Sequence, residues 1–275
     1  MTLLLLAAAL GIAPLDCSEA PALKGSGYCG AAEDGGREKL PTPGVQWRIN
    51  EASATRAPWV DANGWRFERK PGGRYLYVLP AGKAALAAGE AFAYHVDARL
   101  RIDPNDLDAY RHMAAFLKQI DAAPLPARAN LGVLDDGTPL AGEVLNLLAR
   151  RNLLFRVVRE ADPGLDLTVR ITPEAADPSA FAAKVRRQLG DDKRLLRIYG
   201  SEVVVGRLTG DRSRARLHLL NYGGSKIEGL RVRVLGSYSK VEGAPVAAAE
   251  VGLAGGAAEF TLPEVGSYAV VDLTK

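Results

Sequence analysis

NLGVLDDGTPLAGEVLNLLARRNLLFRVV, residues 130–158, is the stretch of sequence that decides the fold class. An apolar run ends at two aspartates, a Gly-Thr-Pro turn follows, and an amphipathic segment leads to a second apolar run. Short apolar runs on either side of a helical pattern indicate two strands joined by a helix. We therefore predict a βαβ crossover, with strands at 130–134 and 153–158 and a helix at 139–151.

The same alternation extends to both sides of this unit. Strand patterns occur at 74–80, 98–102 and 165–171, and helical patterns occur at 81–96, 103–121 and 177–190. Such alternation is typical of a mostly parallel sheet covered by helices. We expect an α/β domain at 45–193 with a flavodoxin-like or amidotransferase-like sheet.

The pattern changes at residue 194. From there to residue 275 the chain consists of short alternating runs separated by Gly, Asp, Ser and Pro, and no helical pattern is present. This pattern predicts a small antiparallel β-sandwich, with 209–214 as a hairpin loop. The fold class is therefore α/β followed by all-β.

The N-terminus has the character of a secretory signal. Residues 2–13, TLLLLAAALGIA, form an apolar run of the right length, although no basic residue precedes it. We expect 1–13 to be a signal segment, cleaved near Gly11 or Ala13, and the protein to be secreted or periplasmic. A lipoprotein signal at Cys17 is disfavoured because Asp16 stands where such signals need a small residue. No later run reaches the roughly 20 apolar residues of a transmembrane helix.

The segment 14–44 is rich in Gly, Ala, Pro and charge, which predicts a flexible arm. It contains the chain's two cysteines, Cys17 and Cys29. In an oxidising compartment they could form a disulfide. The alternative is a pair of unpaired thiols in a flexible leader.

Two motifs carry a family resemblance. One strand pattern ends in HLLNY (218–222), and the last part of the chain contains FTLP (260–263) followed by YAVV (268–271). These resemble the C-terminal β-sandwich of multidomain glycoside hydrolases. The preceding α/β unit resembles the glutamine-amidotransferase-like domain of β-galactosidases, which serves trimerisation. The resemblance covers roughly 128–275 and implies a carbohydrate-related role and a homo-oligomer formed through the α/β domain.

The resemblance does not supply a catalytic centre. In that family the chemistry belongs to an upstream β/α barrel with two carboxylates. A barrel needs about 250 residues, and about 80 lie between Val45 and Pro126. At most a barrel remnant fits at 45–126, so no catalytic residue is carried over. Amidotransferase chemistry needs a cysteine nucleophile, and the α/β region contains none.

The loop after the first apolar run is a weak catalytic candidate. Asp135 and Asp136 follow a predicted parallel strand, where α/β proteins place ligands, and Glu143 lies in the next helix. These acids could gather around hydroxyl groups or a cation. The alternative, which we favour, is that Asp136 or Thr138 caps the helix, that Pro139 occupies its first position and that Asp135 faces solvent.

A second candidate is an aromatic cluster for sugar binding. Aromatic faces combined with amides and carboxylates suit a pyranose ring, and the residues concerned are Trp59, Asp61, Asn63, Trp65 and Tyr75. The alternative is that these rings fill the core.

Other site classes are disfavoured. The net charge is +3 and no basic stripe indicates nucleic-acid binding. Three scattered histidines and two cysteines indicate neither a metal site nor a cofactor, and His218 is expected to be a packing or edge residue.

Together these patterns predict an exported, carbohydrate-associated accessory or assembly module without its own catalytic centre. The alternatives are a diverged glycoside hydrolase with its site at the carboxyl edge of the α/β sheet, and a structural protein of the bacterial cell envelope.

Overall fold

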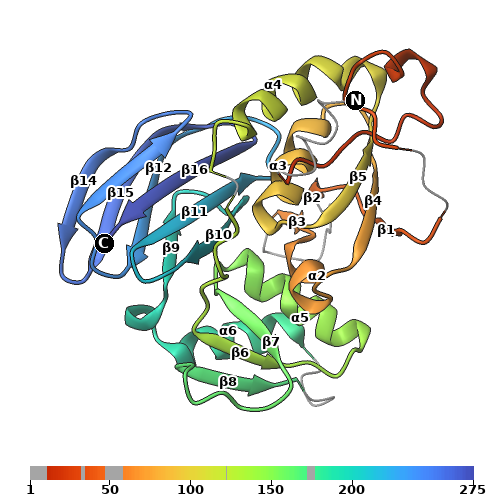
Figure 1. Ribbon diagram of the computed structural model, residues 1–275. Coiled ribbons are helices and arrows are strands. Elements are labelled where there is room, and N and C mark those ends of the chain that lie inside the picture. Colours follow the sequence, from red (N-terminus) through yellow and green to blue (C-terminus); the bar gives the residue numbers. More distant parts are fainter. Residues whose placement is uncertain (1–10, 32–34, 47–57, 122, 172–176) are drawn as a thin grey trace.

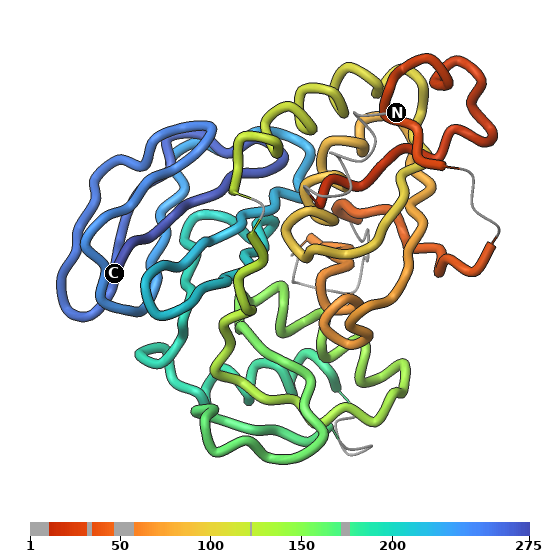
Figure 2. Tube along the Cα trace, viewed as in Figure 1, coloured from red at the N-terminus to blue at the C-terminus, as the bar shows by residue number. Residues whose placement is uncertain are grey.

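The computed structural model describes residues 11–31, 35–46, 58–121, 123–171 and 177–275. The chain forms three units that pack against one another (Figures 1 and 2). The first unit is drawn in red to yellow and the second, below it, in green, whereas the third is the blue two-sheet unit at the left. Each unit has secondary structure of its own, but the three are joined by shared cores.

The first unit is built on a parallel sheet of order β1-β4-β5, with strands Glu38–Leu40, Arg74–Val78 and Asp97–Arg101. The helices α3 (Ala84–Tyr94) and α4 (Leu107–Leu117) cover one face of it, where Tyr77 and Leu100 are fully buried. The remaining elements are η1 (Pro21–Leu23), β2 (Gly44–Gln46), β3 (Trp59–Asp61), α2 (Gly64–Arg69) and η2 (Pro104–Asp106).

Two aspartates fix the turns of the first unit. The Asp103 carboxylate accepts a hydrogen bond from the backbone N–H of Asn105, as a helix cap does. Asp106 accepts hydrogen bonds from Gly82, Lys83 and Ala84 at the start of α3. Both carboxylates therefore stabilise helix starts.

The second unit confirms the predicted crossover. Its parallel sheet has the order β7-β6-β8, with strands Phe155–Val158, Leu131–Leu134 and Leu167–Arg170. The helices are α5 (Pro139–Arg150), α6 (Pro178–Leu189) and the short η3 (Asp191–Lys193).

The parallel strands therefore form two three-stranded sheets. The mixed α/β class is confirmed, whereas the single flavodoxin-like or amidotransferase-like sheet is not. The reason lies between β5 and β6, where the chain first crosses to the third unit. There Ala127 pairs with Thr209, and the N–H of Arg128 donates to the carbonyl of Leu208. The strand β6 consequently begins at a distance from β5.

The third unit is the expected antiparallel sandwich. Its sheets have the orders β10-β11-β16-β13 and β14-β15-β12-β9. The strands are β9 (Leu196–Tyr199), β10 (Val204–Gly210), β11 (Arg214–Asn221), β12 (Ile227–Leu235), β13 (Lys240–Ala244), β14 (Ala249–Ala254), β15 (Ala257–Val265) and β16 (Tyr268–Thr274). Leu217, Val232 and Phe260 belong to the core between the sheets. The sequence did not indicate β13, because KVEGA contains little apolar alternation.

The described part of 14–44 is packed rather than a flexible arm. Leu15 is fully buried, forms a bridge to Leu100 of β5, and belongs with Leu23 to the core of the first unit. Cys17 and Cys29 form a disulfide with a Cα–Cα distance of 5.7 Å. The Gly- and Pro-rich composition suggested a linker, but these leucines anchor the segment to the sheet.

The expected signal segment at 1–13 lies mostly outside the described residues. Its last residues, Ile12 and Ala13, are buried in the core, and the Ala13 carbonyl accepts a hydrogen bond of 2.8 Å from the Tyr110 hydroxyl. Export and cleavage stay predictions.

One buried carboxylate joins the first and third units. Glu90 of α3 is 0% exposed and accepts hydrogen bonds from the Tyr77 hydroxyl at 2.7 Å and the Tyr222 hydroxyl at 2.6 Å. It also accepts bonds from the backbone N–H and the side-chain amide of Asn63 at 2.7 and 3.2 Å. Burial raises the pKa of Glu90, although the bonds from Tyr222, Tyr77 and Asn63 oppose the rise. The buried carboxyl group thus accepts hydrogen bonds from residues in three separate segments of the chain.

We predict that Tyr222→Phe lowers the free energy of unfolding by about 1–3 kcal/mol, because one buried hydrogen bond to Glu90 is lost. Urea unfolding measures the change. Tyr199→Phe is the control, since Tyr199 is 41% exposed and its hydroxyl can bond to water. Equal stability of the two variants would show that the hydrogen bond from Tyr222 to Glu90 does not stabilise the fold.

His218 of β11 is a packing residue at the same junction. It is 1% exposed, its Nδ1 lies 2.7 Å from the Tyr268 hydroxyl, and its ring lies against Phe92. Burial lowers the pKa of His218 well below 6.5, and Arg207, Arg216 and His95 lower it further. The folded protein therefore holds this imidazole neutral.

Since the unfolded histidine titrates near about 6.5, the contribution of His218 to stability is complete above that pH. It is lost as the pH falls toward the depressed folded value. We predict that wild type loses more stability between pH 7.5 and 5 than His218→Gln does. Urea unfolding of both proteins at both pH values gives the loss of stability of each. Subtracting the loss of the variant from that of wild type cancels the contribution of the carboxylates that the two proteins share. Identical pH dependence would show that His218 does not contribute.

Candidate functional site

Asp135 has a structural partner and does not face solvent. Its carboxylate pairs with the Arg69 guanidinium at 2.6 and 2.9 Å, and its side chain is 7% exposed. Arg69 also donates to the Thr138 carbonyl. The ion pair therefore holds α2 of the first unit against the loop that follows β6.

The rest of this loop forms the N-terminus of α5. The Thr138 hydroxyl accepts the N–H of Ala141 at 3.2 Å, and Pro139 occupies the first helical position. Asp136 accepts hydrogen bonds from the N–H and the hydroxyl of Thr138, which lower its pKa. Glu143 is exposed on α5. The described contacts support the capping interpretation for Asp136 and Thr138 and do not connect the three acids.

The aromatic candidates lie mainly at contacts between units. Trp59 and Trp65 pack against the core of the second unit, with Arg150 4.6 Å from the ring centre of Trp59 and Arg66 4.2 Å from that of Trp65. An added Cβ at Gly142 would lie 2.8 Å from Trp65, so α5 approaches this ring closely because residue 142 is glycine.

The other members of the aromatic cluster are also engaged within the protein. Tyr75 is 1% exposed and donates to the Lys70 carbonyl, and Asn63 is 1% exposed and bonds to Glu90. Asp61 accepts hydrogen bonds from Trp59 and Gln46. The structure therefore does not gather these five residues into an open sugar-binding platform.

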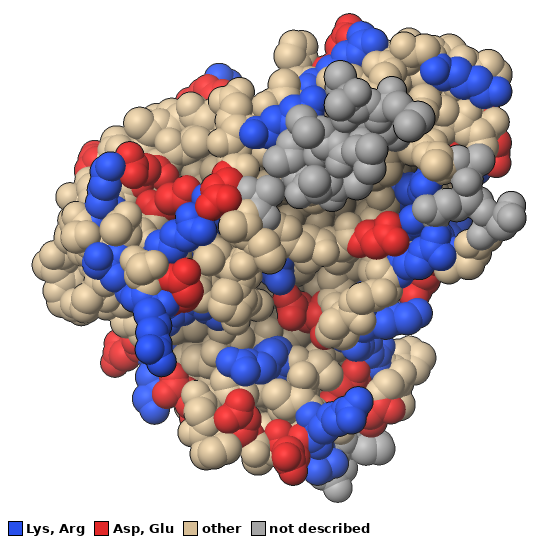
Figure 3. Space-filling view, viewed as in Figure 1, with Lys and Arg blue, Asp and Glu red and all other residues tan. Residues whose placement is uncertain are grey.

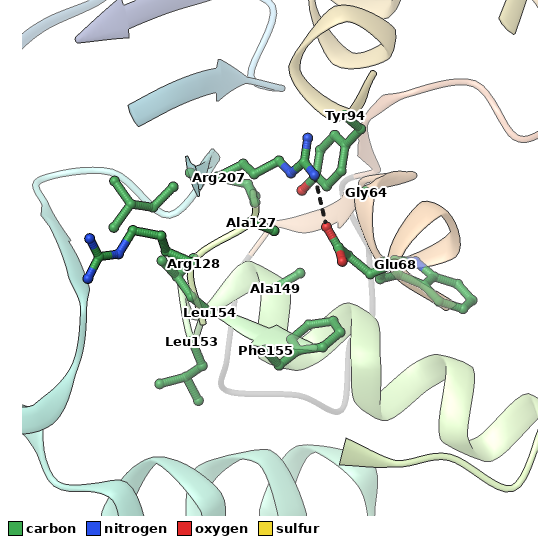
Figure 4. A pocket seen from close by; sticks show the side chains of 14 residues that line it. Gly64, Glu68, Tyr94, Ala127, Arg128, Ala149, Leu153, Leu154, Phe155 and Arg207 are labelled. Atoms are coloured by element: carbon green, nitrogen blue, oxygen red, sulfur yellow. Dashed lines mark ion pairs between the residues drawn. The ribbon is translucent and has the colours of Figure 1, made fainter. Parts of the chain in front are cut away.

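A small cavity lies where the three units meet (Figure 4). It is lined by Trp65 and Glu68 of α2, Tyr94 of α3, Phe155 of β7 and Arg207 of β10, among others. Its volume is about 40 Å³. Because one water occupies about 10–15 Å³ on this scale, the cavity holds a few waters and no sugar ring.

An ion pair crosses this cavity. The Arg207 Nη2 lies 3.4 Å from the Glu68 carboxylate, and its guanidinium lies 4.5 Å from the centre of the Tyr94 ring. The same side chain donates to the Ala93 carbonyl at the end of α3. Burial raises the pKa of Glu68, and Arg207 opposes the rise. Arg207 thus connects the sandwich to α2 and α3.

A larger pocket of about 510 Å³ lies at the first unit. We call it the basic pocket. Its described lining residues are Asp16, Cys17, Ser18, Lys24, Cys29, Gly30, Ala31, Gly35, Gly36, Arg37, Leu76, Arg99 and Arg101. They include four cations and one carboxylate, and the volume lies within the range typical of small-molecule sites.

Ion pairs order part of this pocket. Arg101 donates to Asp16 at 2.7 Å and lies 2.5 Å from Glu19. Burial raises the pKa of Asp16, but hydrogen bonds from Ser18 and Arg101 outweigh it and leave the pKa lowered. Arg37 pairs with Asp97 at 2.8 Å.

Sequence analysis did not identify this pocket. A signal was nevertheless present in ARLRI (98–102), where arginines alternate with apolar residues. In a strand, that alternation places both guanidiniums on the face opposite the core.

The described residues indicate neither a metal centre nor a membrane span. They contain no group of three or more His, Cys, Asp or Glu side chains placed to hold a metal ion. None of the helices in the described ranges has the length and apolar character needed to cross a bilayer. On the face shown in Figure 3, positive and negative residues are interspersed.

The chain matches parts of two solved structures, and the first of them has a similar fold. The α-L-fucosidase isoenzyme 2 from Paenibacillus thiaminolyticus matches with a TM-score of 0.54 and 10% sequence identity, over 74% of this chain and 60% of the fucosidase chain. The apo exo-carrageenase GH42 from Bacteroides ovatus matches with a TM-score of 0.41 and 8% identity, over 85% of this chain and 47% of the carrageenase chain.

The fucosidase match shows that the chain shares its fold with part of a glycoside hydrolase, as the sequence motifs predicted. The chain spans about 60% of that protein's length. No protein-family model matches the sequence, and no curated protein matches it.

We predict that Asp135→Asn lowers the free energy of unfolding by about 1–3 kcal/mol, because it removes a charge-assisted contact between two units. Chemical denaturation measures this loss. Glu242→Gln is the matched control, since the Lys240–Glu242 pair is 61% and 59% exposed, and should cost less than about 0.5 kcal/mol. An Asp135→Asn variant as stable as the control would contradict the structural role of Asp135.

Proposed function

We propose that the chain is an exported, carbohydrate-associated accessory or assembly module without a hydrolytic centre of its own. The fold shared with a fucosidase supports the carbohydrate association. The disulfide between Cys17 and Cys29 supports export, since such bonds persist in oxidising compartments. Assembly would involve self-association of the α/β units.

The proposal that the chain has no hydrolytic centre rests on the number of carboxylates that line the two cavities. Among the described lining residues, the junction cavity has one acid, Glu68, and the basic pocket has one acid, Asp16. Each is paired with an arginine. Glycoside hydrolysis commonly needs two carboxyl groups roughly 5–10 Å apart on either side of the scissile bond. The described lining of each cavity therefore offers one carboxylate fewer than that arrangement needs.

A diverged glycoside hydrolase is the second candidate function. One observation favours it: burial raises the pKa of Glu68, and the residue lies beside Trp65 and Tyr94. A general acid requires a raised pKa of this kind. The small volume of the cavity and the contact with Arg207 weigh against it.

We predict no turnover of aryl glycosides or of plant and bacterial polysaccharides. Wild type is compared with Glu68→Gln, Asp135→Asn and Asp136→Asn by reducing-sugar release and aglycone absorbance. Activity that is present in wild type and lost in one of these variants would establish the hydrolase instead. Retention of wild type on an immobilised polysaccharide, with no products formed, is the expected result.

A further inference from the structure

The segment 14–16 extends the parallel sheet of the first unit beyond its edge strand β5. The N–H of Leu100 in β5 donates to the Pro14 carbonyl at 3.1 Å, and the N–H of Asp16 donates to the Leu100 carbonyl at 2.8 Å. Leu15, between them, forms a parallel bridge to Leu100. Figure 1 shows this segment in red beside β5.

The opposite edge of the same segment is also paired. The N–H of Leu15 donates to the Tyr28 carbonyl at 3.0 Å, and the N–H of Gly30 donates to the Leu15 carbonyl at 2.8 Å. The segment 14–16 therefore lies between β5 and the stretch 28–30, with hydrogen bonds on both sides. Its removal would leave backbone groups of both neighbours without their partners.

The two residues before this segment belong to the core. Ile12 is 2% exposed and Ala13 is 3% exposed, and both pack in the core that contains Tyr110. The buried Tyr110 hydroxyl donates to the Ala13 carbonyl. A chain that began at Pro14 would leave this hydroxyl without its acceptor and would leave a cavity where Ile12 packs.

The sequence offers a signal peptidase two bonds in this region. Small residues stand at the first and third positions before each bond: Ala9 and Gly11 precede Ile12, and Gly11 and Ala13 precede Pro14. The second bond is followed by proline, which has a fixed φ and no N–H for a peptidase to bind. Cleavage of the second bond alone would remove the core residues Ile12 and Ala13.

A lipid anchor at Cys17 is a third way in which the N-terminus could be processed. A lipoprotein begins at its cysteine and carries lipid on that sulfur. Here the Cys17 Sγ is bonded to that of Cys29. Cleavage before Cys17 would also remove Asp16, whose carboxylate accepts a hydrogen bond from Arg101 at 2.7 Å. Both observations argue against a lipid anchor.

We propose that the export signal is removed on the N-terminal side of Ile12, so that the mature chain keeps Ile12 and Ala13 in its core. The bond between Gly11 and Ile12 has the required small residues before it. This inference rests on the export part of the proposed function. It assigns the processing boundary, which the apolar run alone leaves open between Gly11 and Ala13.

The test identifies the first residue of the protein purified from its native host. The α-amino group of the intact chain is labelled, and the N-terminal peptide is sequenced by mass spectrometry. We expect a processed chain that begins at Ile12 or shortly before it.

A chain that begins at Pro14 or later, that carries lipid on Cys17, or that is exported without cleavage would overturn the inference and leave export standing. An unprocessed chain in the cytoplasm would overturn export and the inference together.

The structural reason for the boundary has a separate test that does not depend on export. In the purified full chain, Ile12→Ala should lower the midpoint of thermal unfolding by about 5–10 °C, because it leaves a cavity in the core. Leu253→Ala is the matched control, since Leu253 is 42% exposed, and it should lower the midpoint by less than about 2 °C. Equal shifts would show that Ile12 is not a core residue and would overturn the inference.

Discussion

The buried carboxyl group of Glu90 is the constraint on which the arrangement of the first and third units depends. Its hydrogen-bond partners come from the loop before α2, from β4 and from the turn after β11. A carboxyl group that is fully buried is costly unless it is satisfied, so these partners must be in place together. The position of α3 against both the sheet and the sandwich follows from that requirement.

Close packing around α3 has the same consequence. A Cβ at Gly89 would lie 3.0 Å from Tyr268. The absence of a side chain at residue 89 therefore lets the helix lie this close to the sandwich. Arg207 reaches from the sandwich to the end of the helix and to Glu68. Trp59 and Trp65 then join α2 and β3 to the second unit. Of the aromatic residues that could have formed a sugar platform, Trp59 and Trp65 thus hold units together, whereas Tyr75 is buried in the first unit.

Local signals predicted the crossover and most strands of the sandwich, but not β1, β2, β3, α2 or β13. Contacts between distant segments could not be predicted. The crossover at 130–158 follows from a short-range pattern, and the structure confirms it. Of the two candidate caps of its helix, Asp136 and Thr138, the structure has Thr138 as the N-cap. The pairing of Asp135 with Arg69 spans 66 residues, so no local pattern reveals it. For the same reason the aromatic cluster was ambiguous: a tryptophan suits a core and a sugar site equally well in sequence. The separation into two sheets depends on the pairing of Ala127 with Thr209, which is also non-local.

A glycosidase-like fold does not by itself imply glycosidase chemistry, because function depends on the groups that a fold presents. In this chain the described carboxylates of both cavities are neutralised by arginines, and the loop acids at 135 and 136 stabilise a contact and a helix start. Acids committed to ion pairs and caps are poorly suited to donate and accept protons at a scissile bond. In the basic pocket, Arg101 is paired with Asp16 and Glu19, and Arg37 is paired with Asp97. Hydrolysis of a glycoside commonly needs a second carboxyl group across the scissile bond, and the described lining residues of neither cavity supply one.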